Sequence, residues 1–170
     1  IPTFAGAPKP IYFAELKDGG SSSLVSRVYV LPLISGGWTF GVSHSSTSAT
    51  VGITPWGSTS LIYGQEYQIV VNYDPVNHSS TLWVDPTSEA STSVTDVNAN
   101  AAATAISGFG LRQSSTASTF PANPIFNAGT VNWAYSVDDL GVGTSMADAC
   151  DFPTPVDRST WGKVKQIYRK

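Results

Sequence analysis

The stretch that decides the fold is residues 66–85, EYQIVVNYDPVNHSSTLWVD. Apolar residues recur at every second position in both of its halves, which is the period of a strand with one buried face. Tyr67, Ile69 and Val71 share one face of the first half, and Leu82 and Val84 lie opposite Trp83 in the second. Val70 and Trp83 place some apolar bulk on the other faces, as in a strand that is packed on one side and partly covered on the other. The polar residues between the halves, Asp74–Ser79, include an Asp-Pro pair that favours a turn. The pattern predicts a hairpin in which Glu66–Tyr73 and Ser80–Val84 pair antiparallel.

Short β-like runs of this kind recur along the chain at intervals of roughly 8–12 residues, separated by Gly, Pro, Ser and Asn. The other predicted strands are Ile11–Leu16, Val25–Leu31, Trp38–His44, Ala49–Ile53, Leu61–Tyr63, Ala105–Gln113 and Val131–Val142. The spacing predicts an all-β fold, an antiparallel two-sheet β-sandwich of the jelly-roll type with a short C-terminal helical tail. We expect loops over 85–104 and 114–130, a helical turn at Thr144–Ala149, and a short helix after Ser159 that carries Trp161.

Composition supports a strand-and-turn protein and excludes a helical bundle. The chain has 170 residues, enough for one domain with a sizeable core. Charged residues make up only 12%, so its polarity comes mainly from 23 Ser and 17 Thr, residues common in strands and turns. We expect an extended segment over 1–10, a sandwich domain over 11–150 and a basic tail over 151–170.

Charge is distributed unevenly. Residues 1–157 carry 4 basic and 12 acidic side chains, a net charge of −8, whereas residues 158–170 carry +5. An acidic body repels phosphate backbones, so nucleic acid is not expected as a partner. The chain contains no apolar run long enough for a membrane-spanning helix. Low charge with many Ser and Thr leads us to expect an extracytoplasmic protein that is secreted, at the cell surface or periplasmic.

The hairpin segment resembles the LamG-like group of concanavalin A-type jelly rolls. In that group a strand ending in Tyr-Asp, here Tyr73-Asp74, turns into a strand reading roughly L-Y-V-D-G, here Leu82–Asp85 followed by Pro86 in place of Gly. The stretch Ala105–Gln113 and residues 137–145, VDDLGVGTS, look like the closing strands of such domains in bacterial secreted proteins. The resemblance implies two stacked sheets, often with a concave carbohydrate-binding face and sometimes a calcium ion.

Aromatic side chains are the main candidates for ligand contact, because an exposed ring can stack on a sugar. The candidate ligand-binding residues are Trp56, Tyr63 and Trp38. Trp56 lies between Pro55 and Gly57 in a predicted turn, where exposure is expected. Trp83 and Trp133 are further candidates, although core packing is the alternative for a tryptophan on a strand.

Calcium is a possible cofactor because the chain offers several oxygen ligands. The weak candidates are Asp74, Asp85 and Asp138, with Asp96 and Asp139 as further carboxylates, but they form no calcium-loop motif. No other cofactor is expected.

Catalysis is not expected from these residues. A glycosidase needs two acids across a cleft, and Asp138 and Asp139 would point to opposite faces of a strand. A Ser–His–Asp site would have to use His44 or His78. Cys150 has an acidic setting that would raise its pKa and weaken it as a nucleophile.

The expected function is a non-catalytic extracellular module for glycan contact or adhesion at a cell surface. The alternatives are a structural subunit of an extracellular or periplasmic assembly and, third, a polysaccharide-active enzyme. About nine short strands are few for two full sheets, and the chain starts without Met in a Pro-rich segment. We therefore also expect a donor strand from a longer precursor or another protein chain to complete the sandwich.

Overall fold

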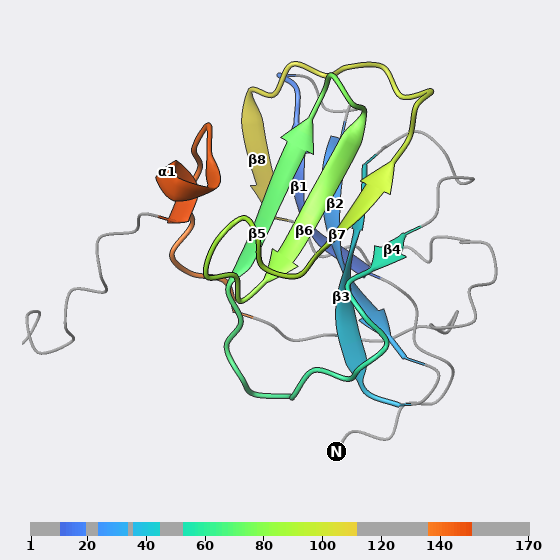
Figure 1. The fold of residues 1–170 in the computed structure, drawn as a ribbon, viewed down its shortest axis with the longest axis vertical. Helices are drawn as coiled ribbons and strands as arrows, with labels where there is room; N and C mark the ends of the chain where they lie inside the picture. Colours follow the sequence, from blue (N-terminus) through green and yellow to red (C-terminus); the bar gives the residue numbers. More distant parts are fainter. Residues whose placement is uncertain (1–10, 20–23, 34–35, 45–52, 112–135, 151–170) are drawn as a thin grey trace, which may run out of the picture. The chain divides into compact units, whose positions relative to one another are not determined.

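The computed structural model describes residues 11–19, 24–33, 36–44, 53–111 and 136–150. Contacts within the chain divide it into two compact units, Ile1–Trp133 and Ala134–Lys170, and each is described by itself. The first unit holds eight strands among its described residues (Figure 1). They are β1 (Ile11–Lys17), β2 (Leu24–Pro32), β3 (Trp38–Ser43), β4 (Thr54–Pro55), β5 (Ile69–Asp74), β6 (Ser79–Val84), β7 (Ser93–Val97) and β8 (Gly108–Leu111).

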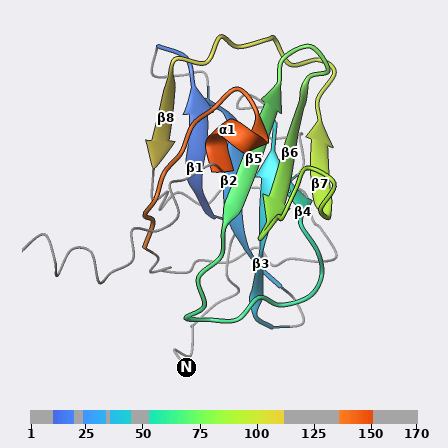
Figure 2. The same cartoon turned by 60° about the vertical axis from the view of Figure 1, so that its left-hand side comes forward.

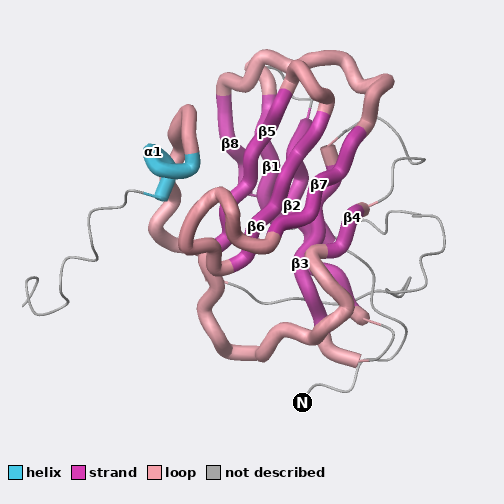
Figure 3. Tube along the Cα trace, viewed as in Figure 1, coloured by secondary structure: helices cyan, strands magenta, loops and turns pink. Residues whose placement is uncertain are grey.

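The strands form two antiparallel sheets packed together as a β-sandwich, as predicted. One sheet has the order β4-β3-β2-β1-β8 and the other the order β5-β6-β7. The smaller sheet lies over one side of the larger, with β5 over β2, β6 over β3, and β7 over β3 and β4 (Figures 1 and 2). Long connections join β4 to β5 and β7 to β8 (Figure 3).

The predicted hairpin is confirmed. β5 and β6 pair antiparallel from Ile69 opposite Val84 to Asp74 opposite Ser79. The Asp74 carboxylate shapes the turn by accepting hydrogen bonds from the backbone N–H of Val76 (2.9 Å) and of Asn77 (2.9 Å). An aspartate that bonds the backbone of the residues just after it is the turn chemistry that the sequence indicated.

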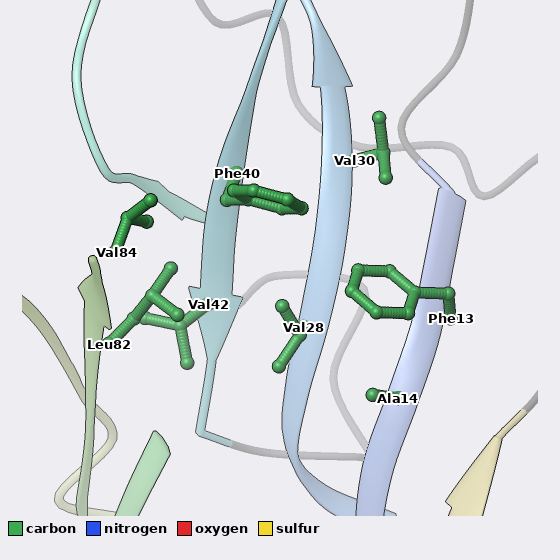
Figure 4. Packing of buried hydrophobic residues seen from close by; sticks show 8 residues of the cluster. All are labelled: Phe13, Ala14, Val28, Val30, Phe40, Val42, Leu82 and Val84. Carbon is green, nitrogen blue, oxygen red and sulfur yellow. The ribbon is translucent and has the colours of Figure 1, made fainter. Parts of the chain in front are cut away.

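The core between the sheets consists of apolar side chains from β1, β2, β3 and β6. It contains Phe13, Ala14, Val28, Val30, Phe40, Val42, Leu82 and Val84 (Figure 4). Leu82 and Val84 reach from β6 toward Val42 and Phe40 of β3. Tyr67, Ile69 and Val71 pack against this core. The face that carries Ile69 and Val71 on β5 and Leu82 and Val84 on β6 is therefore the face that is buried.

The other face of the five-stranded sheet is also buried. Tyr12, Tyr29, Leu31 and Ile53 form a second apolar cluster there. β2 therefore carries buried residues on both faces, which explains its nearly continuous apolar sequence. Gly41 of β3 leaves the space in which Leu31 and Ile53 pack, because an added Cβ would come within 2.5 Å of Leu31 Cδ1 and 2.8 Å of Ile53 Cγ2.

Several predicted elements differ from the structure. Leu61–Tyr63 is not a strand, and the predicted loop 85–104 contains β7. Residues 136–142 of the predicted strand Val131–Val142 are not in a strand either. Asp138 and Asp139 are therefore not strand neighbours on opposite faces, and Asp139 adopts a left-handed backbone with φ of 50°.

Other predictions concern the ends of elements and the second unit. Ile53 lies outside any strand, and β4 begins one residue later. The helical turn predicted at Thr144–Ala149 is present as α1 (Met146–Cys150). The predictions for 1–10, 45–52, 112–135 and 151–170 lie outside the described residues. In the part of the chain that the structure describes, there is no helix that is both long and apolar enough to span a membrane.

Candidate functional site

Four aromatic rings gather where β3 begins, and we call Trp38, Phe40, Tyr63 and Tyr67 the aromatic corner. The Trp38 ring centroid lies 5.0 Å from that of Phe40 and 5.8 Å from that of Tyr67, both edge to face. Tyr63 lies 6.0 Å from Trp38 with its ring tilted by 44°. Phe40 belongs to the core whereas Tyr63 is 61% exposed, so the rings lead from the interior to the surface.

Hydrogen bonds hold the segment before Tyr63 against β3. The Leu61 N–H donates to the Trp38 carbonyl over 2.7 Å, and the Ile62 N–H donates to the Tyr67 hydroxyl over 2.8 Å. A Cβ on Gly37 would collide with the Ser60 side chain, and Gly37 has a φ of 83°. Only glycine satisfies both constraints at this position without strain. The exposed ring of Tyr63 is thus presented from a segment tied at two points.

The structure brings two of the three predicted ligand-binding residues together. Trp38 and Tyr63 are neighbours in the aromatic corner. Trp56 instead packs half-buried against the core, and its indole Nε1 is buried without a hydrogen-bond partner. Its backbone N–H donates to the Phe40 carbonyl over 2.8 Å. Trp83 is half-buried on β6 and donates from Nε1 to the Glu89 carbonyl over 3.3 Å, and Trp133 lies outside the described residues.

The carboxylates considered for calcium do not gather. Asp74 and Asp85 lie at opposite ends of the β5–β6 hairpin. Asp74 accepts hydrogen bonds from backbone N–H groups of its own turn, whereas Asp85 accepts one from the backbone N–H of Gln68, just before β5. Hydrogen bonds from Asn77 hold the pKa of Asp74 below its usual value. Asp138 belongs to the second unit. Among the described residues no three His, Cys, Asp or Glu side chains are grouped so that they could hold a metal ion.

A buried polar network joins the two sheets away from the aromatic corner. We call it the inter-sheet network, and it comprises Ser26, His44, Thr54, Ser80 and Asp96. The Ser26 and Ser80 hydroxyl oxygens lie 2.5 Å apart, and His44 Nδ1 lies 2.9 Å from the Ser80 hydroxyl. The Asp96 carboxylate accepts from the His44 backbone N–H (2.8 Å) and from the Thr54 hydroxyl (3.0 Å).

This network contains the residue types of a serine hydrolase but differs from that site in geometry. In a catalytic triad the carboxylate holds the histidine ring and the serine is exposed to substrate. Here Asp96 binds the backbone of His44 rather than its ring, and His44 and Ser80 are both fully buried. Burial lowers the pKa of His44 and raises the pKa of Asp96. The arrangement joins strands of the two sheets through side chains that are buried or half-buried.

The inter-sheet network was not predicted from the sequence. One signal was available, because Ser80 shares the strand face of Leu82 and Val84 and therefore had to point into the core. A buried hydroxyl requires a partner. The sequence did not show which residue would supply it.

Cys150 and His78 were also considered for catalysis. Burial raises the pKa of the Cys150 thiol in the second unit, which makes it a weaker nucleophile. His78 sits in the β5–β6 turn with a φ of 49°.

Comparisons with known proteins identify no relative of this chain: no family model, no curated protein and no solved structure matches it.

Proposed function

We propose that this chain is a non-catalytic β-sandwich module, of the LamG-like jelly-roll kind and located outside the cytoplasm, that contacts glycans through the aromatic corner. The observation that carries the proposal is the exposed ring of Tyr63, supported from behind by Trp38. An aromatic face supplies an apolar, weakly polarised surface on which the C–H groups of a sugar ring can rest. The two-sheet architecture and the hairpin at 66–85 support the choice of fold family.

The surroundings of the aromatic corner favour a neutral ligand. Glu66 is the sole charged residue between Ile53 and Tyr73. Ile62 is 63% exposed next to Tyr63, and the hydroxyl-bearing residues Ser58, Thr59 and Ser60 precede them on the surface. A surface of rings and hydroxyls with little charge suits uncharged sugars better than phosphate-bearing or strongly anionic ligands.

The test is a titration of tryptophan fluorescence with neutral oligosaccharides, namely β-glucan and galactan fragments. Because Trp38 lies beside Tyr63, a sugar stacked on the corner should change the emission, and saturation should give a dissociation constant. Tyr63→Ala should weaken binding at least about tenfold, a loss near 1.4 kcal/mol. Tyr63→Phe is the matched control, since it keeps the ring and removes only the hydroxyl. Equal binding by Tyr63→Ala and the parent chain would refute the role of the corner.

A structural subunit of an extracellular assembly is the second candidate. β8 ends the five-stranded sheet and β5 ends the three-stranded sheet, so among the described strands each has a single hydrogen-bonded neighbour. Such edges can accept a strand from another chain. Sedimentation of the purified chain separates the two functions: the module predicts monomers that bind sugar, whereas the subunit predicts concentration-dependent assembly without sugar.

A further inference from the structure

We propose that the inter-sheet network is an acid-sensitive clamp: with His44 neutral it holds the two sheets together, and protonation of His44 loosens it. This inference is independent of the proposed glycan contact, because it concerns a buried cluster that the proposed function does not use.

The hydrogen bonds of the inter-sheet network connect residues of one sheet with residues of the other. Ser26 lies on β2 and Ser80 on β6, so their 2.5 Å contact crosses from one sheet to the other. His44 follows β3 directly and reaches Ser80 with its ring. Thr54 of β4 reaches Asp96 of β7, and Asp96 also holds the backbone of His44. Each of these four hydrogen bonds therefore joins the two sheets.

The surroundings of the His44 ring favour its neutral form. His44 is fully buried, its Nδ1 contacts Ser80, and its Nε2 is buried without a hydrogen-bond partner. A neutral ring can carry its proton on Nδ1 and donate it in a hydrogen bond to the Ser80 hydroxyl, which in turn donates its own O–H to the Ser26 hydroxyl. Nε2 is then an unprotonated acceptor. A protonated ring carries N–H on both nitrogens. The positive charge would then be buried, and burying a charge is costly.

The groups that face the His44 ring act on its protonation in both directions. Asp96 and Asp74 favour the protonated ring by their negative charge, and a contact with the Ser79 backbone favours it too. His78 opposes it, and Tyr73 stacks on the ring at 5.3 Å with 15° between the planes, excluding water from that side. Burial is the largest of these effects, and it holds the pKa of His44 below its usual value.

The sign of the pH dependence follows from that direction. A histidine whose pKa is lower in the folded state is protonated first in the unfolded state, so stability is fully present above about pH 6.5 and falls as the pH drops below it. The raised pKa of Asp96 acts in the opposite sense, because folding then favours its protonated form. Its contribution grows as the pH falls through the folded pKa of Asp96, and it is also present in a variant that keeps Asp96 but lacks His44.

The test measures urea unfolding midpoints at about pH 7.5 and about pH 5.5, on either side of the ordinary histidine pKa. The parent chain should unfold at lower urea at the lower pH. His44→Asn should show no such difference, because its amide can replace Nδ1 as the partner of Ser80 and does not titrate. His78→Asn is the matched control: asparagine tolerates the left-handed backbone at this position, and the pH difference should persist.

A second measurement keeps the proposal testable if His44→Asn does not fold. An NMR titration of the parent chain should show the His44 ring protonating below about pH 6.5, in step with a fall in amide protection on β6 and β7. A His44 midpoint at or above that value would overturn the proposal. So would a folded His44→Asn variant that still unfolds at lower urea at the lower pH.

Discussion

Replacing Gly41 by alanine tests the packing of the second apolar cluster most directly. The new Cβ would meet Leu31 Cδ1 at 2.5 Å, Ile53 Cγ2 at 2.8 Å and the Thr54 carbonyl oxygen at 3.1 Å. Two of these neighbours are buried side chains and the third is backbone, so none can move away freely. Overpacking of this kind costs about 1–3 kcal/mol, and the lower entropy of the unfolded alanine chain returns about 0.4–1 kcal/mol.

We therefore expect Gly41→Ala to lower the free energy of unfolding by up to about 2.6 kcal/mol, with a central value of about 1.3 kcal/mol, which is the overpacking cost less the entropy gain. Gly57→Ala is the matched control. Its Cβ would meet only the Thr59 backbone nitrogen at 4.0 Å, and its backbone is not left-handed. The control should be neutral or stabilising by up to about 1 kcal/mol. Urea unfolding followed by tryptophan fluorescence measures both variants.

A double-mutant cycle identifies the clash. Leu31→Ala alone should cost about 2–5 kcal/mol, because it empties a fully buried site. Combined with Gly41→Ala, it removes the atom that the new methyl group would strike, so the two losses should fall short of additive by about 0.5–3 kcal/mol. Strictly additive losses, or a Gly41→Ala variant as stable as Gly57→Ala, would refute the packing described for this face of the sheet.

Two further predictions concern the β5–β6 hairpin. Leu82→Ala should lower the free energy of unfolding by about 2–5 kcal/mol, since Leu82 is fully buried in the core, whereas Val76→Ala at an 82% exposed turn position should change it by less than about 0.5 kcal/mol; urea unfolding that ranks them equally would contradict the core assignment. The Asp74 carboxyl should titrate below its ordinary value in a carbon-detected NMR titration, so its contribution to stability is present above that value and lost as the pH falls through the folded pKa. Asn77→Ala should move this midpoint upward by removing the side-chain donor at 2.7 Å, and an unchanged midpoint would contradict the turn geometry.

The hairpin was predictable because two local signals agree in it. Alternation fixes the buried face, and the aspartate-containing turn fixes where the chain reverses. β7 was missed because its sequence, SVTDV, places an aspartate at the inward position that a core residue usually occupies. Asp96 is buried there because His44 and Thr54 supply its hydrogen bonds. Both donors lie more than forty positions away in the sequence. No pattern within the segment itself therefore predicts that β7 is a strand.

Leu61–Tyr63 shows the opposite error. Three apolar residues in a row suggest a strand, but Leu61 packs on the core whereas Ile62 and Tyr63 are exposed. Gly64 then adopts a left-handed backbone with φ of 78°. The sequence identified Trp38 and Tyr63 as candidates for ligand contact. Their contact was not predictable, because it depends on hydrogen bonds between β3 and a segment more than twenty residues later.

β3 links the two sites of this protein while keeping them apart. Trp38 begins the strand in the aromatic corner, and His44 follows its last residue in the inter-sheet network. Six residues of extended chain span about 20 Å, beyond the 7–10 Å or so within which substitutions usually couple. The proposed sugar binding at Tyr63 and the proposed acid sensitivity at His44 should therefore be separable. Both nevertheless depend on the same core, because Phe40 and Val42 of this strand pack against Leu82 and Val84 between the two ends. A core substitution that disturbs both sites at once is thus uninformative about either, whereas Tyr63→Ala and His44→Asn each probe one site alone.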